Sequence, residues 1–177
     1  MSGASGGGPV TEIDERYGSE GAEATPWPQG RAVLEKAGIY WLTTVRPDGR
    51  PHVTPLIAVW SEGAVYFCTG AEERKARNLA GNPHATLTTG CNDLHAGLDV
   101  VVEGDAVRVG DEALLRRVAG AYTAKYGDEW RFEVEDGAFR HPDGGRADVY
   151  RLAPVTAFGF GRGAVSSQTR WRFAPAD

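Results

Sequence analysis

The chain has 177 residues, 41% of them hydrophobic and 24% charged, a composition typical of a globular protein large enough to bury a core. Nineteen basic against 24 acidic residues give a net charge of −5, which argues against a general nucleic-acid or anionic-membrane function, since both need a basic face. No apolar run reaches the length of a membrane span, and the Gly- and Ser-rich start lacks the apolar centre of a signal peptide.

The first 25 residues are rich in Gly, Ser, Ala and Glu without periodicity, so we expect a mobile tail that buries too little surface to become ordered. A single domain is expected over residues 26–177. It begins with a short helix over residues 30–37, which has Val33, Leu34 and Ala37 on one face and ends at Gly38.

Six runs rich in β-branched and aromatic residues follow, bounded by Gly, Pro, Asn and Asp, and they predict a mainly β core. Two helices interrupt them: residues 72–80, ended by Gly81, and residues 112–126, whose apolar residues recur every four positions and whose stripe should lie across a barrel or sheet mouth. Short connections favour an antiparallel barrel over a parallel sheet. The six predicted strands are residues 39–45, 52–60, 64–69, 85–89, 99–109 and 148–160.

The stretch "RPDGRPHVTP" at residues 46–55 predicts a hairpin turn at Asp48-Gly49, followed by a strand that carries Pro51 and Pro55. Each proline removes a ladder donor, so the strand belongs at an edge or a bend. The residues between the prolines keep their N–H groups and could offer them to a ligand.

"CTGAEERKARNL" at residues 68–79 places Thr69 at a strand end, a turn at Gly70, and a helix that carries Arg74, Lys75 and Arg77. Backbone donors and clustered cations are what a phosphate group needs, with Glu72 and Glu73 directed outward. The alternative is a solvated helix face with Glu73 paired to Arg77.

Other motifs support no further chemistry. "GFGRGA" at residues 159–164 matches a dinucleotide fingerprint, but the 13 residues after it are too few for a βαβ unit. His52, His84, His95 and His141 lack metal-ligand spacing, and Cys68 and Cys91 form no metal or redox motif, so we expect no metal site, reduced thiols and a cytoplasmic protein. In "TRWRF" at residues 169–173, Trp171 is either a core residue or a wall for a planar ring.

Taken together, "YWLTTVRPDGRPHVTPLIAVW", "AVYFCTG", "ERKARNLAGNPHATLTT", "DVVVEGDAVRV" and "TRWRF" resemble the pyridoxamine 5'-phosphate oxidase-like family of flavin-binding split barrels. The resemblance implies a six-stranded antiparallel Greek-key split β-barrel with a few short helices, and a homodimer with FMN or a deazaflavin coenzyme at its interface. By position it implies cofactor contacts in three groups: His52, Val53, Thr54 and Pro55 along the ring and ribityl chain; Thr69, Arg74 and Lys75 at the phosphate; Asp99, Arg170 and Trp171 near the ring.

The chain departs from the enzymes that oxidise pyridoxamine phosphate, because it has Thr54 and Val59 where the resemblance implies an arginine and a lysine. It resembles more closely the branch of the family that uses FMN or a deazaflavin for other reductions. We therefore expect hydride transfer by the cofactor to or from an unidentified small molecule, without an assigned catalytic side chain. A cation such as Arg170 or Arg172 could stabilise the reduced ring. The alternative is a non-catalytic protein that binds flavin, deazaflavin or haem.

Overall fold

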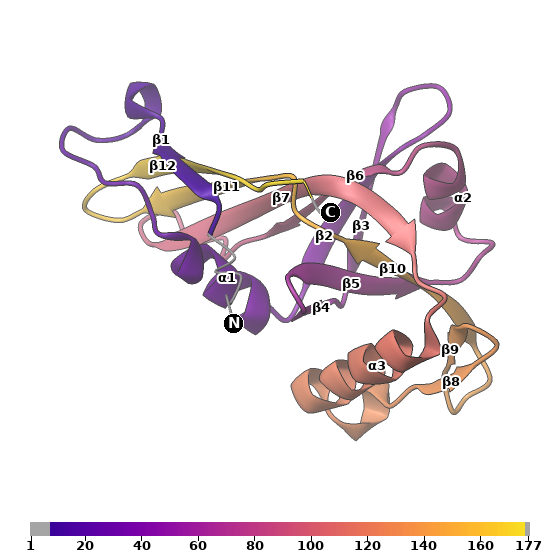
Figure 1. Cartoon of the computed structure of the whole chain (residues 1–177). Helices are drawn as coiled ribbons and strands as arrows, with labels where there is room; N and C mark the ends of the chain where they lie inside the picture. The colour runs from indigo at the N-terminus through magenta and orange to yellow at the C-terminus, as the bar shows by residue number, and fades with distance from the viewer. Residues whose placement is uncertain (1–7, 176–177) are drawn as a thin grey trace, which may run out of the picture.

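The computed structural model describes residues 8–175, and in this part of the chain every strand pairing is antiparallel (Figure 1). The helices are α1 (Trp27–Lys36), α2 (Arg74–Gly81) and α3 (Glu112–Tyr126), with 3-10 turns η1 (Glu15–Tyr17) and η2 (Asp128–Trp130). The twelve strands are β1 (Val10–Ile13), β2 (Tyr40–Val45), β3 (Pro51–Leu56), β4 (Val59–Ser61), β5 (Ala64–Thr69), β6 (His84–Thr89), β7 (Gly97–Arg108), β8 (Glu133–Glu135), β9 (Ala138–Arg140), β10 (Arg146–Leu152), β11 (Thr156–Arg162) and β12 (Ser167–Arg172).

The prediction of a mainly β, antiparallel barrel with a few short helices is confirmed. The structure has more strands than the six predicted runs, because residues 52–60 divide into β3 and β4 and residues 148–160 into β10 and β11. Strands β1, β8 and β9 have only three or four residues each and carry no strong pattern of their own. No helix within residues 8–175 is both long and apolar enough to cross a membrane.

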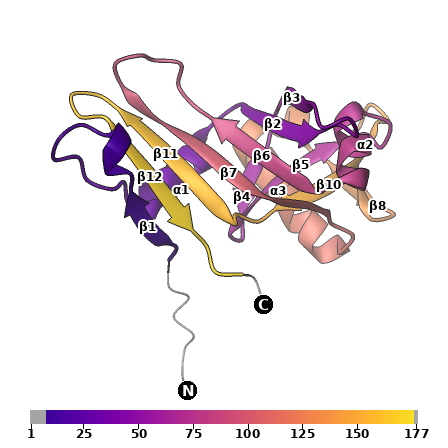
Figure 2. The same cartoon turned by 90° about the horizontal axis from the view of Figure 1, so that it is seen from above.

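Strand β7 pairs with three other strands of the sheet. It pairs with β6 and β11 along its first part and with β10 at its end, where Ala106 faces Leu152 (Figure 2). Gly104 lies where β7 changes partners, and a Cβ atom there would overlap the carbonyl oxygen of Ala153. A glycine therefore lets the two backbones approach at this change of partner.

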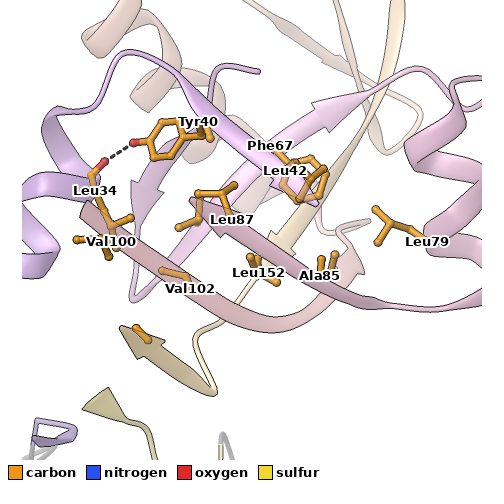
Figure 3. Packing of buried hydrophobic residues seen from close by; sticks show 14 of the residues in the cluster. Leu34, Tyr40, Leu42, Phe67, Leu79, Ala85, Leu87, Val100, Val102 and Leu152 are labelled. Atoms are coloured by element: carbon orange, nitrogen blue, oxygen red, sulfur yellow. Dashed lines mark hydrogen bonds between the residues drawn. The ribbon is translucent and has the colours of Figure 1, made fainter. Parts of the chain in front are cut away.

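The main core fills the space between the strands, as Figure 3 shows for Leu42, Phe67, Leu87, Val102 and Leu152. These side chains are completely buried. Each contributes on the order of 1.5–3 kcal/mol through removal of its apolar surface from water.

A second apolar cluster lies between α3 and the strands β4, β5 and β9. It buries Leu115, Val118, Tyr122 and Phe139, which confirms the predicted apolar stripe of residues 112–126. In Figure 1 this helix and the β8–β9 hairpin form a layer below the barrel.

Several predicted boundaries are wrong. Helix α1 spans Trp27–Lys36 and not residues 30–37, and α2 begins at Arg74 and not at residue 72. Residues 10–13 were expected in the mobile tail but form β1, because they pair with β12, from Val10 opposite Arg172 to Ile13 opposite Thr169. Residues 1–7 of the expected tail lie outside the described residues. Gly81 is the last residue of α2 and not a left-handed cap; Asn82, in an extended conformation, ends the helix.

Candidate phosphate site

Strand β3 is an edge strand, since within the described chain it pairs with β2 alone. The turn before it is the predicted hairpin at Asp48-Gly49, with Gly49 at φ +83°. Across this turn the N–H of Arg46 donates to the carbonyl of Arg50 at 3.0 Å. This bond fixes which residues of β3 face β2, because hydrogen-bonded and non-hydrogen-bonded pairs alternate along an antiparallel ladder.

By this alternation, the backbone groups of His52 and Thr54 face β2, whereas those of Pro51, Val53 and Pro55 face the free edge. The two prolines therefore cost the ladder no hydrogen bond and protect an exposed edge. From the sequence, the N–H groups of His52, Val53 and Thr54 are all predicted to be available to a ligand. The register corrects this, because only the N–H of Val53 faces outward.

Helix α2 is fixed over the start of β3 by a buried hydrogen bond. The Asn78 amide nitrogen donates to the hydroxyl of Thr44 at 2.9 Å, and both residues are buried. Thr44 lies opposite His52 in the β2–β3 ladder. The bond therefore holds the first turn of α2, with Arg74 and Lys75, next to His52.

Four basic side chains converge at this point. Burial lowers the pKa of His52, and the positive charges of Arg46, Arg74 and Lys75 lower it further. His52 Nδ1 and Arg46 Nε are buried and have no hydrogen-bond partner among the described residues. The unpaired Arg46 Nε–H donor and the concentrated positive charge are what a phosphate group would satisfy, so these residues fit a bound phosphate.

Glu73 is the acidic residue that faces this cluster, contrary to the prediction that it points outward. Its carboxylate accepts a hydrogen bond from Lys75 and another from the Gly70 N–H at 2.9 Å. Burial alone would raise the pKa of Glu73, but the bonds from Lys75 and Gly70 outweigh burial and lower it. The alternative Glu73–Arg77 pair does not form, because Arg77 pairs with the exposed Glu72 at 2.6 Å.

Thr69 lies at the end of β5, where the chain turns towards α2. It is only 2% exposed, and its hydroxyl donates to the Gly70 carbonyl at 3.3 Å. In this structure Thr69 therefore shapes the turn, and its contact with a phosphate stays a prediction. The half-buried Thr54 likewise stays a predicted contact.

The structure does not bring Asp99 and Arg170 to this site. Asp99 lies about 17 Å along β7 from Gly104, and the ladders through β6 place Gly104 level with the end of β2 that carries Thr44. Asp99 pairs with Arg162 at 3.0 Å, and Arg170 pairs with Glu12 at 2.6 Å. Figures 1 and 2 both place β12, which carries Arg170, at the opposite end of the sheet from α2.

Trp171 is a core residue. Its ring is completely buried beside Trp27, at 5.2 Å between ring centroids, and its Nε1 donates to the carbonyl of Thr25 at 2.9 Å. A buried indole has no face free for a ligand. Within one chain the core interpretation of Trp171 therefore applies, and its contact with a cofactor stays a prediction.

Arg46 is the site residue that the sequence analysis missed. It belongs to the quoted "RPDGRPHVTP" stretch but is 28 positions before Arg74, so only the fold brings the two charges to the same histidine. Within residues 8–175, no group of three or more His, Cys, Asp or Glu side chains is arranged to hold a metal ion.

Binding of a phosphate group is expected to raise the pKa of His52, because an anion offsets the three neighbouring positive charges. The affinity should then increase as the pH falls through the His52 titration, since binding takes up a proton. NMR titration of the histidine rings with and without inorganic phosphate would measure this shift, with the exposed His95 as an internal control. A His52 pKa that stays constant or falls would contradict the assignment.

The fold and this cluster define a class: an antiparallel split-barrel protein with a group of basic side chains between an edge strand and a helix N-terminus. A sequence profile described as pyridoxamine 5'-phosphate oxidase matches residues 26–159. The chain belongs to this family.

One relative is similar in sequence, and two solved structures are similar in fold. The chain is 30% identical over 136 residues to a pyridoxine/pyridoxamine 5'-phosphate oxidase of Rhodospirillum rubrum; the match covers 73% of this chain and 64% of that protein, less than two thirds of its length. A conserved hypothetical protein of Mycobacterium tuberculosis has a similar fold (TM-score 0.63, 20% identity, 77% of this chain and 85% of that one). So does a heme binding protein of Mycobacterium smegmatis (TM-score 0.61, 18% identity, 82% and 58%).

Proposed function

We propose that the protein is an oxidoreductase that transfers hydride between bound FMN, or a deazaflavin coenzyme, and a small molecule. The observation that carries the proposal is the group of Arg46, His52, Arg74 and Lys75, with buried nitrogens on Arg46 and His52 that have no hydrogen-bond partner among the described residues. This group would hold the phosphate that both cofactors carry. The Val53 N–H and the neighbouring Pro55 would line the rest of the cofactor along the free edge of β3.

The cofactor, when bound, supplies the hydride chemistry. The residues of the chain bind the phosphate, orient the ring and exclude water. No side chain is assigned to proton transfer. Within one chain we do not propose Arg170 or Arg172 for stabilising a reduced ring, because both pair with the carboxylate of Glu12 at the end of the sheet away from α2.

Oxidation of pyridoxamine phosphate, the reaction named for the family and for the relative from Rhodospirillum rubrum, is not what we propose. Val59 stands where the resemblance implies a cation, and it is only 2% exposed within the core. Thr54 provides no charge at the other position. The chain therefore lacks both positive charges that the resemblance to these enzymes implies at these two positions.

We further propose a cytoplasmic homodimer with the cofactor at its interface. Three large apolar residues are unusually exposed on and around β2 and β3, namely Ile39 at 52%, Trp41 at 48% and Val53 at 55%. A second copy would remove this apolar surface from water. Sedimentation would test the proposal, and a monomer that still binds cofactor would contradict the interface.

The visible absorption spectrum of the purified protein, before and after addition of FMN or a deazaflavin coenzyme, tests the cofactor. We expect a flavin or deazaflavin spectrum that persists through gel filtration. A haem spectrum instead would favour the storage or sensing alternative, and a protein that binds none of the three would contradict both functions. Turnover of reduced cofactor with quinone or enone acceptors would then separate an enzyme from a carrier.

Replacement of Glu73 by Gln is expected to strengthen FMN binding several-fold, because the substitution removes the negative charge that holds Lys75. The amide oxygen can still accept from the Gly70 N–H, so the turn is kept. Glu72→Gln is the matched control, since Glu72 is exposed and contacts Arg77. Fluorescence titration with FMN would measure both, and weaker binding by Glu73→Gln would contradict the proposed phosphate position.

A further inference from the structure

An apolar groove of about 420 Å³ lies between the barrel and the 3-10 turn η2. Its lining comes from two sides, because one of the residues belongs to η2 and the others to the barrel. The lining residues are Ile39, Pro55, Leu56, Ile57, Cys68 and Trp130. None of these side chains is charged at neutral pH, since burial raises the pKa of the Cys68 thiol to about 11.

The indole of Trp130 forms the aromatic wall of the groove. Its ring lies 6.4 Å from that of Phe132 and 6.2 Å from that of His141, measured between centroids. His141 is itself held in place, because its Nε2–H donates to the carbonyl of Glu129 at 3.1 Å. Trp130 is only half-buried by these neighbours. An indole that is supported in this way and lines a groove is a good surface for stacking a flat ring.

The groove begins where the proposed cofactor edge of β3 ends. Pro55 lines the groove and lies on the same face of the sheet as Ile39, because Pro55 pairs with Trp41, two positions after Ile39. Along β3, Pro55 is about 10 Å from His52, at which the basic side chains converge. The chain between the phosphate and the ring of a flavin has a comparable length. A cofactor that runs along β3 from His52 would therefore place its ring at the mouth of the groove.

The absence of charge from the lining restricts the ligand. A charged molecule would exchange its hydration for walls that offer no opposite charge, which is unfavourable. The two positions at which the resemblance implies cations hold Thr54 and Val59, so these positions provide no counter-charge either. An uncharged apolar molecule loses little hydration in such a groove and gains from the removal of its surface from water.

From these observations we propose that the groove binds the small molecule of the proposed function, and that this molecule is an uncharged, apolar ring compound that stacks on Trp130. Aryl ketones and quinones belong to this class, whereas phosphorylated and carboxylated rings do not. The inference rests on the proposed function for the cofactor at β3. The binding of the ring compound depends on the groove alone.

Calorimetric titration of the full chain with 2-acetylnaphthalene and with naphthalene-2-sulfonate tests the proposal. The two probes share one ring system and differ in charge, and neither reacts with a thiol such as that of Cys68. We expect the uncharged ketone to bind about tenfold or more tightly than the sulfonate, because only the sulfonate leaves a charge without a partner.

Two substitutions test the walls of the groove. Trp130→Leu should weaken binding of the ketone about fivefold or more, because it removes the stacking surface. Tyr17→Leu is the matched control, since Tyr17 is an exposed aromatic residue of the other 3-10 turn, η1, and does not line the groove. Ile39→Lys, at a side chain that is 52% exposed, adds a cation to the lining and should shift the preference towards the sulfonate.

Equal affinity for the two probes, a preference for the sulfonate, or no binding of either by the wild-type protein would overturn the proposal, and none of these results needs a variant. Ketone binding that is unchanged in Trp130→Leu while self-association is lost would show that a second copy covers the groove, and would overturn it as well. The visible spectrum reports the cofactor separately. A flavin-bound protein that prefers the sulfonate refutes this inference alone, and a protein without a cofactor that prefers the ketone refutes the proposed function alone.

Discussion

Joint replacement of Arg74 and Lys75 by Ala is expected to weaken FMN binding by about a hundredfold or more. Charged hydrogen bonds contribute about 1.5–3 kcal/mol each, and every 1.4 kcal/mol is about a factor of ten in affinity. Lys75 should account for the larger share, because it is only 8% exposed and therefore less screened by water than the exposed Arg74. Fluorescence or calorimetric titration with FMN would measure the two single variants and the double variant.

Arg77→Ala is the matched control on the same helix. Arg77 is exposed and pairs with Glu72, so its loss should change FMN affinity little. Thermal unfolding of each variant would show whether the fold is kept, which matters for Lys75 because its removal leaves Glu73 without its partner. FMN affinity that is unchanged in a folded double variant would refute the phosphate site.

The sequence predicts best those elements whose signal is local. The helix over residues 112–126 is predicted to the residue. Leu115, Val118 and Tyr122 form an apolar stripe whose spacing can be recognised without knowing which strands the helix packs against. The strand over residues 64–69 was also predicted to the residue, since four of its six residues are apolar and buried. Local pattern and tertiary burial agree in both elements.

Strand β1 could not be predicted, because it has only four residues and exists through its pairing with β12, which lies about 160 positions further along the chain. Glu12 reinforces the pairing through Arg170 and Arg172. An element that depends on such distant contacts leaves no periodic signal in its own sequence.

The candidate site also contains residues that a local pattern predicts and residues that only distant contacts bring into place. Clustered cations on one short helix predict Arg74 and Lys75 as site residues, but no local pattern places Arg46 beside the same histidine or directs Glu73 towards Lys75. The orientation of Glu73 follows from the Gly70 N–H, which needs an acceptor after β5 ends. It is a hydrogen-bonding requirement of the folded turn and not a property of the helix pattern.

Truncation of Trp171 is expected to have the largest effect on stability. Trp171→Ala should lower the free energy of unfolding by about 3–5 kcal/mol, as for other buried aromatic residues, and lower the Tm on the order of 10 °C. The ring is completely buried beside Trp27 and between two glycines, so a cavity would remain on several sides. Chemical denaturation and thermal unfolding would measure the loss.

The two glycines make a sharper test of this packing. A Cβ atom at Gly30 would lie 2.8 Å from Trp171 Cη2, and one at Gly159 would overlap the same end of the ring. Gly159→Ala should therefore cost about 1–3 kcal/mol in the wild-type protein, but less in a Trp171→Phe background, where the shorter ring leaves room. Additive costs would show that the glycine is required for another reason.

Trp171→Phe also decides between the two roles that the sequence left open for this residue. If Trp171 only packs in the core, the folded variant should bind FMN with unchanged affinity, because no face of the indole reaches the surface of the chain. If the indole forms a wall of the cofactor site, affinity should fall while the phosphate contacts at Lys75 remain intact. Unfolding and FMN titration of this one variant, compared with Lys75→Ala, therefore separate loss of packing from loss of binding.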